Sequence, residues 1–344
     1  MDKTQRLLGK YKKLPAAEQD IVLVLAILFS PLGQTKFRDF FRSLEHVDAT
    51  VSKRIAKELR EQLEKDKLIT VSHDGWRCAA EIRNPLMKMA AVERPELLQE
   101  INDYFLNEQS YVSQHLGLVY LLRKLRMAIY LNDMPEIISN LPRIYDLYTS
   151  QFVEGLNVII FDVFDAEWFE TRALDIRYII LESYISANYL SLTPIDLVLS
   201  LAKQYLMRES EPSQSLLEIY IQYQLSCGQL EDVQAILGKV ESLSHEAQAT
   251  YYFLTNENYK AIESYQCALI ERKKGTKKRN ICLTGLPAFF FYAALIRSAS
   301  PENNTLLKTQ ISILMKNEVE YFTGLNKHYL EVLAVYQGMQ QQLQ

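Results

Sequence analysis

The sequence predicts a mainly α-helical protein, in which a small N-terminal module precedes a long body of paired helices. Two observations support this fold class. Apolar residues recur with a helical period over most of the chain, and glycine and proline together supply only 21 of 344 residues, about half their usual share. Because these two residues interrupt helices, their scarcity favours long helices over many short strands. A hydrophobic content of 48% and a charged content of 23% are typical of a globular chain.

Three helices are predicted in the N-terminal module. The first covers residues 16–30 and ends before Pro31 and Gly33, which terminate helices. The second covers residues 34–44, and the third covers residues 50–66. The second and third helices have apolar stripes at helical spacing, formed by Phe37, Phe40, Phe41 and Leu44 and by Val51, Ile55, Leu59 and Leu63, respectively.

A β-hairpin is predicted directly after the third helix. Residues 68–71 form a short β-like run, Asp74-Gly75 is a strong hairpin-turn signal, and residues 76–82 supply the return strand. Three helices followed by a hairpin is the order of a winged helix, a variant of the helix-turn-helix. We therefore expect a winged-helix domain over residues 1–90 and a helical repeat domain over residues 91–344.

Basic residues on the third helix and the hairpin form a candidate nucleic-acid interface. Lys53, Lys57 and Arg60 recur at i, i+4 and i+7 with Arg54 beside them, and Arg77 lies in the wing. Such a stripe can lie on phosphates or enter a major groove. The first 90 residues carry 17 Lys and Arg against 12 Asp and Glu, a net charge of +5, whereas the rest of the chain has a net charge of −9. This asymmetry fits a nucleic-acid-facing N-terminus.

The same pattern has an alternative interpretation. Glu58, Glu61 and Glu64 share the third helix, and a mixture of Lys and Glu is also typical of a solvated face with i, i+4 ion pairs. Many winged helices contact proteins, and the charge asymmetry between the two parts is also compatible with chance. The first turn of the helix has no Asn or Gln, which argues against base-specific readout.

The body is predicted to be a succession of helices joined by short links. This order indicates antiparallel helix pairs stacked in a solenoid. The predicted helices cover residues 118–130, 135–148, 166–190, 194–207, 215–226, 288–298, 304–317 and 329–342, besides the pair within 247–270.

The pair within residues 247–270 resembles the tetratricopeptide repeat. Its first helix contains Tyr251 and Tyr252, its turn lies at residues 255–258, and small residues at Ala261 and Ala268 allow the second helix to approach its neighbours closely. Residues 223–240 resemble a preceding repeat, and residues 122–141 resemble a third more weakly. The expected body is therefore a tetratricopeptide-like α-solenoid.

A basic segment at residues 271–280 follows this pair, with six Lys and Arg residues around Gly275. Next to the apolar helix that follows, such a loop can bind phosphate or an acidic peptide. The alternative is a solvated loop between helices. The candidate contacts for an anion or a protein partner are Lys273, Lys274, Lys277, Lys278 and Arg279.

No motif of an enzyme is found in the sequence. It has no phosphate-binding glycine-rich loop and no nucleophile elbow. The five histidines are scattered without metal-ligand spacing. Acidic residues at 162–170 are interpreted as the start of a helix. We therefore expect a non-enzymatic protein without metal, cofactor or small-molecule substrate, with an enzyme of unrecognised type as the alternative.

Composition also predicts the compartment. The four cysteines form no C-x-x-C pair, which is typical of reduced thiols in a cytosolic protein. The N-terminus has no signal peptide pattern. Residues 21–29 form an apolar run of nine, well short of the ~20 that a membrane span needs. A cytoplasmic protein without membrane contact is expected.

Two stretches of the chain are similar to the N-terminal region of bacterial Swi/Snf-type helicases. They are Trp76-Arg77-Cys78-Ala79-Ala80 with the residues that follow to Ala90, and residues 261–298 with Lys273-Lys274-Gly275-Thr276-Lys277-Lys278-Arg279 and Leu283-Thr284-Gly285-Leu286-Pro287-Ala288-Phe289-Phe290. In that family a winged-helix segment and a helical-repeat segment precede the ATPase core. No residues of the family's ATP site occur here, so the resemblance implies an accessory region in DNA-associated work.

The leading functional hypothesis is a non-catalytic accessory module. It would dock on DNA through the winged helix and on protein through the helical repeats. The protein partner implied by the resemblance is a helicase ATPase core, in the same or another chain. The alternative is a pure protein-interaction scaffold that binds no nucleic acid.

Overall fold

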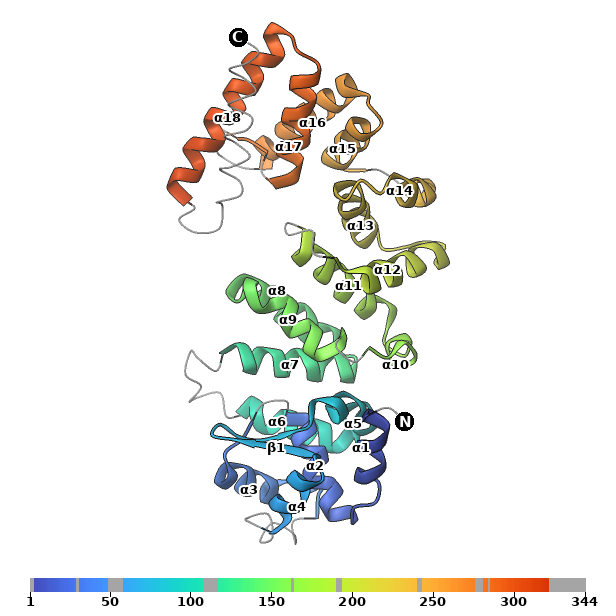
Figure 1. Ribbon diagram of the computed structural model, residues 1–344, viewed down its shortest axis with the longest axis vertical. Helices are drawn as coiled ribbons and strands as arrows, with labels where there is room; N and C mark the ends of the chain where they lie inside the picture. The colour runs from blue at the N-terminus through green and yellow to red at the C-terminus, as the bar shows by residue number, and fades with distance from the viewer. Residues whose placement is uncertain are drawn as a thin grey trace. The chain divides into compact units, whose positions relative to one another are not determined.

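A computed structural model describes residues 3–28, 31–48, 58–107, 117–161, 164–189, 194–239, 243–275, 281–283 and 285–321. The chain is mainly α-helical, as predicted, and the described residues include one two-stranded sheet (Figure 1). It divides into two compact units, Met1–Ala187 and Asn188–Gln344. The boundary expected at residue 90 falls inside a continuous helix of the first unit. Within the described ranges no helix has the length and apolar character to cross a membrane.

The first unit is built around one buried helix. The elements of its N-terminal part are α1 (Lys3–Tyr11), α2 (Ala16–Leu28), α3 (Gln34–Ser43), α4 (Glu58–Lys65), β1 (Ile69–Ser72), β2 (Gly75–Cys78), α5 (Ala80–Glu93) and α6 (Pro95–Asn107). Each residue from Ile21 to Leu28 in α2 is at most 2% exposed, because this run is apolar on every face. Helices α5 and α6 and strand β2 pack around α2.

The hairpin β1–β2 pairs in the expected order. Its antiparallel register places Ile69 opposite Cys78 and Thr70 opposite Arg77. Leu32, in the link between α2 and α3, extends the sheet by an isolated bridge to Trp76, whose N–H donates to the Leu32 carbonyl at 3.0 Å. The link after α2 is thereby tied to the turn of the hairpin.

In the predicted N-terminal module one strand differs from the prediction, and part of one helix lies outside the described residues. The return strand expected over residues 76–82 is shorter, because β2 ends at Cys78 and Ile82 lies in α5. The helical spacing of the buried residues Ile82, Leu86 and Ala90 explains this difference, since that face of α5 packs against α2. Residues 49–57, which make up most of the first half of the predicted third helix, lie outside the described residues.

The remaining elements of the first unit are α7 (Gly117–Leu131), α8 (Met134–Leu147), α9 (Thr149–Leu156), the π-helical turn η4 (Asn157–Phe161), α10 (Ala166–Glu170) and α11 (Leu174–Tyr189). Helices α7 and α8 match the predicted ranges closely. Asp133 caps α8 by accepting from the Glu136 N–H at 3.2 Å.

The single helix predicted over residues 166–190 is two helices, α10 and α11. Between them Arg172 turns inward and its Nη1 donates to the carbonyls of Ile129 and Tyr130 at 3.3 and 2.6 Å. These carbonyls belong to the last turn of α7, where the helix supplies few donors of its own, since the Ile129 carbonyl accepts one long backbone bond of 3.4 Å from the Asn132 N–H. The break in the helix therefore places a cation on the C-terminal end of α7.

Arg126 plays the corresponding role for α2. It is 1% exposed, and its Nη1 donates to the carbonyls of Ala26 and Ile27 at 2.7 and 3.4 Å. Its Nη2 donates to the Arg83 carbonyl at 3.3 Å and to Asn84 Oδ1 at 3.1 Å. Arg123 Nε reaches the Leu28 carbonyl at 3.0 Å. Two arginines of α7 thus satisfy the buried C-terminal end of α2.

The second unit contains α12 (Asp196–Arg208), α13 (Gln214–Ser226), α14 (Leu230–Ile236), the 3-10 turn η5 (Leu237–Lys239), α15 (His245–Leu254), α16 (Asn258–Gly275), α17 (Gly285–Arg297) and α18 (Pro301–Tyr321). Helices α15 and α16 pack along each other across a short turn, and α17 packs against both. A buried hydrogen bond of 2.8 Å joins the hydroxyls of Thr250 and Tyr265 in this cluster. The last predicted helix, residues 329–342, lies outside the described residues.

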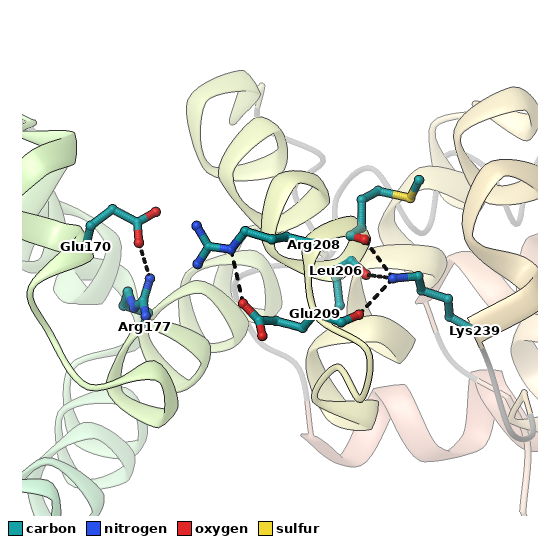
Figure 2. Close-up of polar contacts among 7 residues, drawn as sticks. Glu170, Arg177, Leu206, Arg208, Glu209 and Lys239 are labelled. Atoms are coloured by element: carbon teal, nitrogen blue, oxygen red, sulfur yellow. Dashed lines mark hydrogen bonds and ion pairs between the residues drawn. The ribbon is translucent and has the colours of Figure 1, made fainter.

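A lysine caps α12 in the same manner as the arginines of the first unit. Lys239 Nζ donates to the carbonyls of Leu206, Met207 and Glu209 at 2.9, 2.7 and 2.8 Å, as Figure 2 shows. An ion pair of 2.5 Å between Glu170 and Arg177 in the same figure links α10 to α11.

We predict that Gly75→Ala destabilises the first unit by more than about 1 kcal/mol. Gly75 has φ +132°, and an added Cβ would lie 2.2 Å from the Leu32 carbonyl oxygen. Both tryptophans of the chain, Trp76 and Trp168, belong to this unit, so urea unfolding followed by tryptophan fluorescence measures it. Gly9→Ala is the control, because nothing lies within 4 Å of its Cβ and a gain of about 0.5–1 kcal/mol is expected there. Equal effects of the two changes would contradict the argument.

We also predict that Arg126→Met destabilises the first unit by on the order of 3 kcal/mol, because buried carbonyls of α2 lose their donors. The same fluorescence-detected unfolding tests this. Arg143→Met, at an exposed position of α8, is the matched control and is expected to change stability by less than about 0.5 kcal/mol. An Arg126→Met variant as stable as the control would show that α2 does not need the cap.

Candidate nucleic-acid interface

An open groove lies at the base of the hairpin. Its walls are the start of α1, the end of α4, both strands of the hairpin and the start of α5, and its volume is about 570 Å³. Four basic side chains, Lys3, Lys67, Arg77 and Arg83, and two acidic ones, Glu64 and Glu81, line it. Basic groups therefore outnumber acidic ones around this concavity.

Arg77 projects from the outer face of the hairpin. Along β2, Trp76 and Cys78 are buried while Arg77 between them is exposed, because successive side chains of a strand point to opposite faces. Its cross-strand neighbour Thr70 is exposed as well. Among the described residues Arg77 forms no ion pair, so its full charge faces solvent.

Lys67 stands where α4 ends and β1 begins. Its backbone is left-handed, with φ 62°. The Lys67 N–H donates to the Glu64 carbonyl at 2.9 Å and the Leu68 N–H to the Leu63 carbonyl at 3.0 Å. This pair of bonds is the Schellman motif, which terminates a helix and usually places glycine in the left-handed position. The motif holds the exposed Lys67 side chain at the edge of the groove.

Both acidic residues of the groove have basic partners. Glu81 accepts a hydrogen bond from Lys3 Nζ. That bond, together with the Glu81 backbone N–H, holds the pKa of the Glu81 carboxyl below its ordinary value. Glu64 Oε2 lies 3.9 Å from Arg60 Nε, on the preceding turn of α4. Among the described residues neither carboxylate forms an ion pair with Lys67 or Arg77.

Two further groups shape the floor of the groove. Burial lowers the pKa of Arg83, whose Nη2 donates to the Cys78 carbonyl at 3.3 Å. Burial raises the pKa of the Cys78 thiol to about 12. Cys78 and Cys282 are buried, whereas Cys227 and Cys267 are exposed. The Cys78 thiol is thus neutral and shielded at physiological pH.

The structure describes only part of the interface expected from the sequence. Lys53, Arg54 and Lys57 lie outside the described residues. Arg60 is half-buried and engaged with Glu64, whereas Arg77 is exposed. The fold brings Lys3, Lys67 and Arg83 into the same groove as Arg77, and the sequence did not predict these three residues. A lysine at the junction of a predicted helix and strand is the signal that points to Lys67.

The second predicted site, in the basic segment, is partly helical. The loop expected from residue 271 instead continues α16 as far as Gly275, with Lys273 and Lys274 exposed in its last turn. Basic side chains are favourable at a helix C-terminus, and Arg272 Nε is held by Glu246 at 2.7 Å. Both effects extend the helix into the predicted loop. Lys277, Lys278 and Arg279 lie outside the described residues.

The acidic residues near α10 have structural roles. Asp165 caps α10 by accepting from the Trp168 N–H at 3.0 Å and binds Lys88 Nζ at 2.8 Å. Glu170 pairs with Arg177. Within the part of the chain that the structure describes, no three His, Cys, Asp or Glu side chains are grouped so that they could hold a metal ion.

Comparison of the chain with models of protein families, with curated proteins and with solved structures finds no match.

We predict that the destabilisation caused by Cys78→Ala shrinks as the pH rises from 8 to 10. The ordinary thiol pKa of 9.0 is raised to about 12 in the folded protein. Above about pH 9 the unfolded chain loses this proton, whereas the folded chain keeps it, so the wild-type protein becomes less stable as the pH rises. The Cys78→Ala variant has no such thiol and does not lose this stability, so the difference between the two becomes smaller. Urea unfolding monitored by tryptophan fluorescence at each pH measures the difference. A penalty that stays constant over this range would contradict the pKa assignment.

Proposed function

We propose that α2, α3, α4 and the β1–β2 hairpin form a winged helix that binds a nucleic-acid duplex. The order of elements supports this proposal: a helix, an extended segment at Leu32, two helices and a hairpin. The isolated bridge between Leu32 and Trp76 also supports it, since a winged helix is expected to have a third extended segment beside the hairpin. The observation that carries the function is the groove at the base of the hairpin, where Lys67 and Arg77 present charges without ion pairs among the described residues.

Contacts in this interface are to the phosphate backbone. Lys and Arg side chains on a helix and a wing position a protein on a duplex without reading its sequence. The residues proposed to contact the nucleic acid are Lys53, Arg54, Lys57, Arg60 and Arg77, to which the fold adds Lys67. Acidic residues interleaved on α4 (Glu58, Glu61 and Glu64) limit the strength of binding by this helix.

The helical body is proposed to be a tetratricopeptide-like docking platform for protein. The resemblance to Swi/Snf-type helicases makes a helicase ATPase core, in the same or another chain, the partner that fits. In this proposal the chain is a non-catalytic accessory module, and Lys273, Lys274, Lys277, Lys278 and Arg279 are candidate contacts to an acidic partner.

A protein scaffold without nucleic-acid binding is the second candidate, and one observation favours it. Helix α8 has an apolar stripe on its outer face, where Ile138 is 55% and Tyr145 is 36% exposed. These two residues are seven positions apart and so share a face with Pro142 between them. Exposed apolar stripes of this kind are typical of protein contacts.

We predict that wild type binds a 20-base-pair duplex in a salt-dependent manner and that Arg77→Gln weakens this binding. Loss of one phosphate contact reduces the slope of log K against log salt by about 1, with a loss of affinity on the order of tenfold at low salt. Fluorescence anisotropy of labelled duplex between 50 and 200 mM salt is the measurement. Lys13→Gln, an exposed lysine beyond the far end of α1, controls for the change in net charge.

Two results would decide against nucleic-acid binding. The first is the absence of affinity for any duplex at low salt, in wild type and in Lys57→Glu alike. The second is a pulldown in which the chain retains a protein partner but no nucleic acid, which would favour the scaffold.

A further inference from the structure

Three other helices in the described residues end in the same way as α4. Helices α7, α13 and α15 are each followed by a left-handed residue, with φ values of 58°, 74° and 65°. The same two backbone bonds close each end, as for α15, where the Asn256 N–H donates to Phe253 at 3.1 Å and the Glu257 N–H to Tyr252 at 2.7 Å. The left-handed residues there are Asn132, Gly228 and Asn256.

Lys67 departs from this pattern. Glycine and asparagine adopt the left-handed conformation at the lowest cost, whereas a long side chain with a full Cβ is strained there. A strained residue that the surrounding structure maintains is a pointer to function. At α4 a lysine occupies the position that glycine or asparagine occupies in the other three helices, and this lysine lines the groove.

Glu81 and Lys3 are the second observation. Their ion pair lies in the same groove, with Glu81 at the start of α5 and Lys3 at the start of α1. The anion that Lys3 binds in this structure is therefore the Glu81 carboxylate. An incoming anion competes with it for Lys3.

We propose that this groove is a subsite for the backbone phosphates of a nucleic acid, with Lys67 and Arg77 as its contacts and the Lys3–Glu81 ion pair as an internal competitor. The proposal rests on the proposed function, and it adds the groove ligand and its regulation. A phosphate that enters releases Lys3 from Glu81 and takes the place of the carboxylate. Because the contacts are to phosphate, the subsite does not distinguish sequences.

The Lys67→Gly variant tests the contact. It removes the cation and also the strained Cβ, so we expect weaker duplex binding together with a Tm at or above that of wild type. At 50 mM salt the expected loss of affinity is on the order of tenfold, the salt slope falls by about 1, and two duplexes of unrelated sequence respond alike. Lys13→Gln is the matched control, because it removes a lysine of the same module outside the groove.

The Glu81→Gln variant tests the competition. Removing the internal carboxylate frees Lys3, so we expect tighter binding, on the order of threefold or more at 50 mM salt, and a steeper salt slope. Glu96→Gln is the control, since it changes the net charge equally at an exposed position of α6 away from the groove.

The outcomes separate this proposal from the one on which it rests. If wild type binds duplex while Lys67→Gly binds like Lys13→Gln, the groove is not a subsite, although the winged helix remains a nucleic-acid binder. Tightening by Glu81→Gln no greater than that by Glu96→Gln overturns the competition, and a Tm of Lys67→Gly below wild type overturns the strain argument. If the wild-type protein binds no duplex at low salt, the proposed function itself is wrong.

Discussion

The guanidinium of Arg126 lies at the buried C-terminal end of helix α2. Because α2 is apolar on every face from Ile21 to Leu28, this stretch is buried, and its last carbonyls are buried with it. Buried carbonyls without donors are costly, and the planar fork of an arginine can supply several donors from one side chain. Arg126 also donates to Arg83 and Asn84. One side chain of α7 therefore fixes α2 and α5 together, and the hairpin and its groove are built on these two helices.

The same solution recurs along the chain. Arg172 donates to the end of α7, Lys239 to the end of α12, and Lys10 to the Asp66 carbonyl just beyond α4 at 3.1 Å. Each cation lies at the negative end of a helix dipole and supplies donors that the backbone lacks. A protein made mainly of helices has many such ends to satisfy. Charged residues that appear from the sequence to face solvent are in these cases part of the packing between helices.

Periodicity alone predicted the helical class and the bounds of α3, α7, α8, α12 and α13 to within a few residues. Three features were beyond its reach. Arg126 lies in an apolar helix, where the sequence cannot distinguish a buried cap from an exposed charge. The break between α10 and α11 depends on Arg172 reaching a helix distant in sequence. Lys67 was overlooked because backbone bonds terminate α4, and no glycine or asparagine marks the left-handed position in the sequence.

The distribution of the aromatic and sulfur side chains gives the two units different chemistry. Both indole rings belong to the first unit, and both exposed thiols, Cys227 and Cys267, belong to the second. A maleimide dye therefore reacts with one half of the chain, while ultraviolet excitation of tryptophan reports on the other. Energy transfer between the two provides an internal ruler for the arrangement of the halves, and it requires no engineered residue.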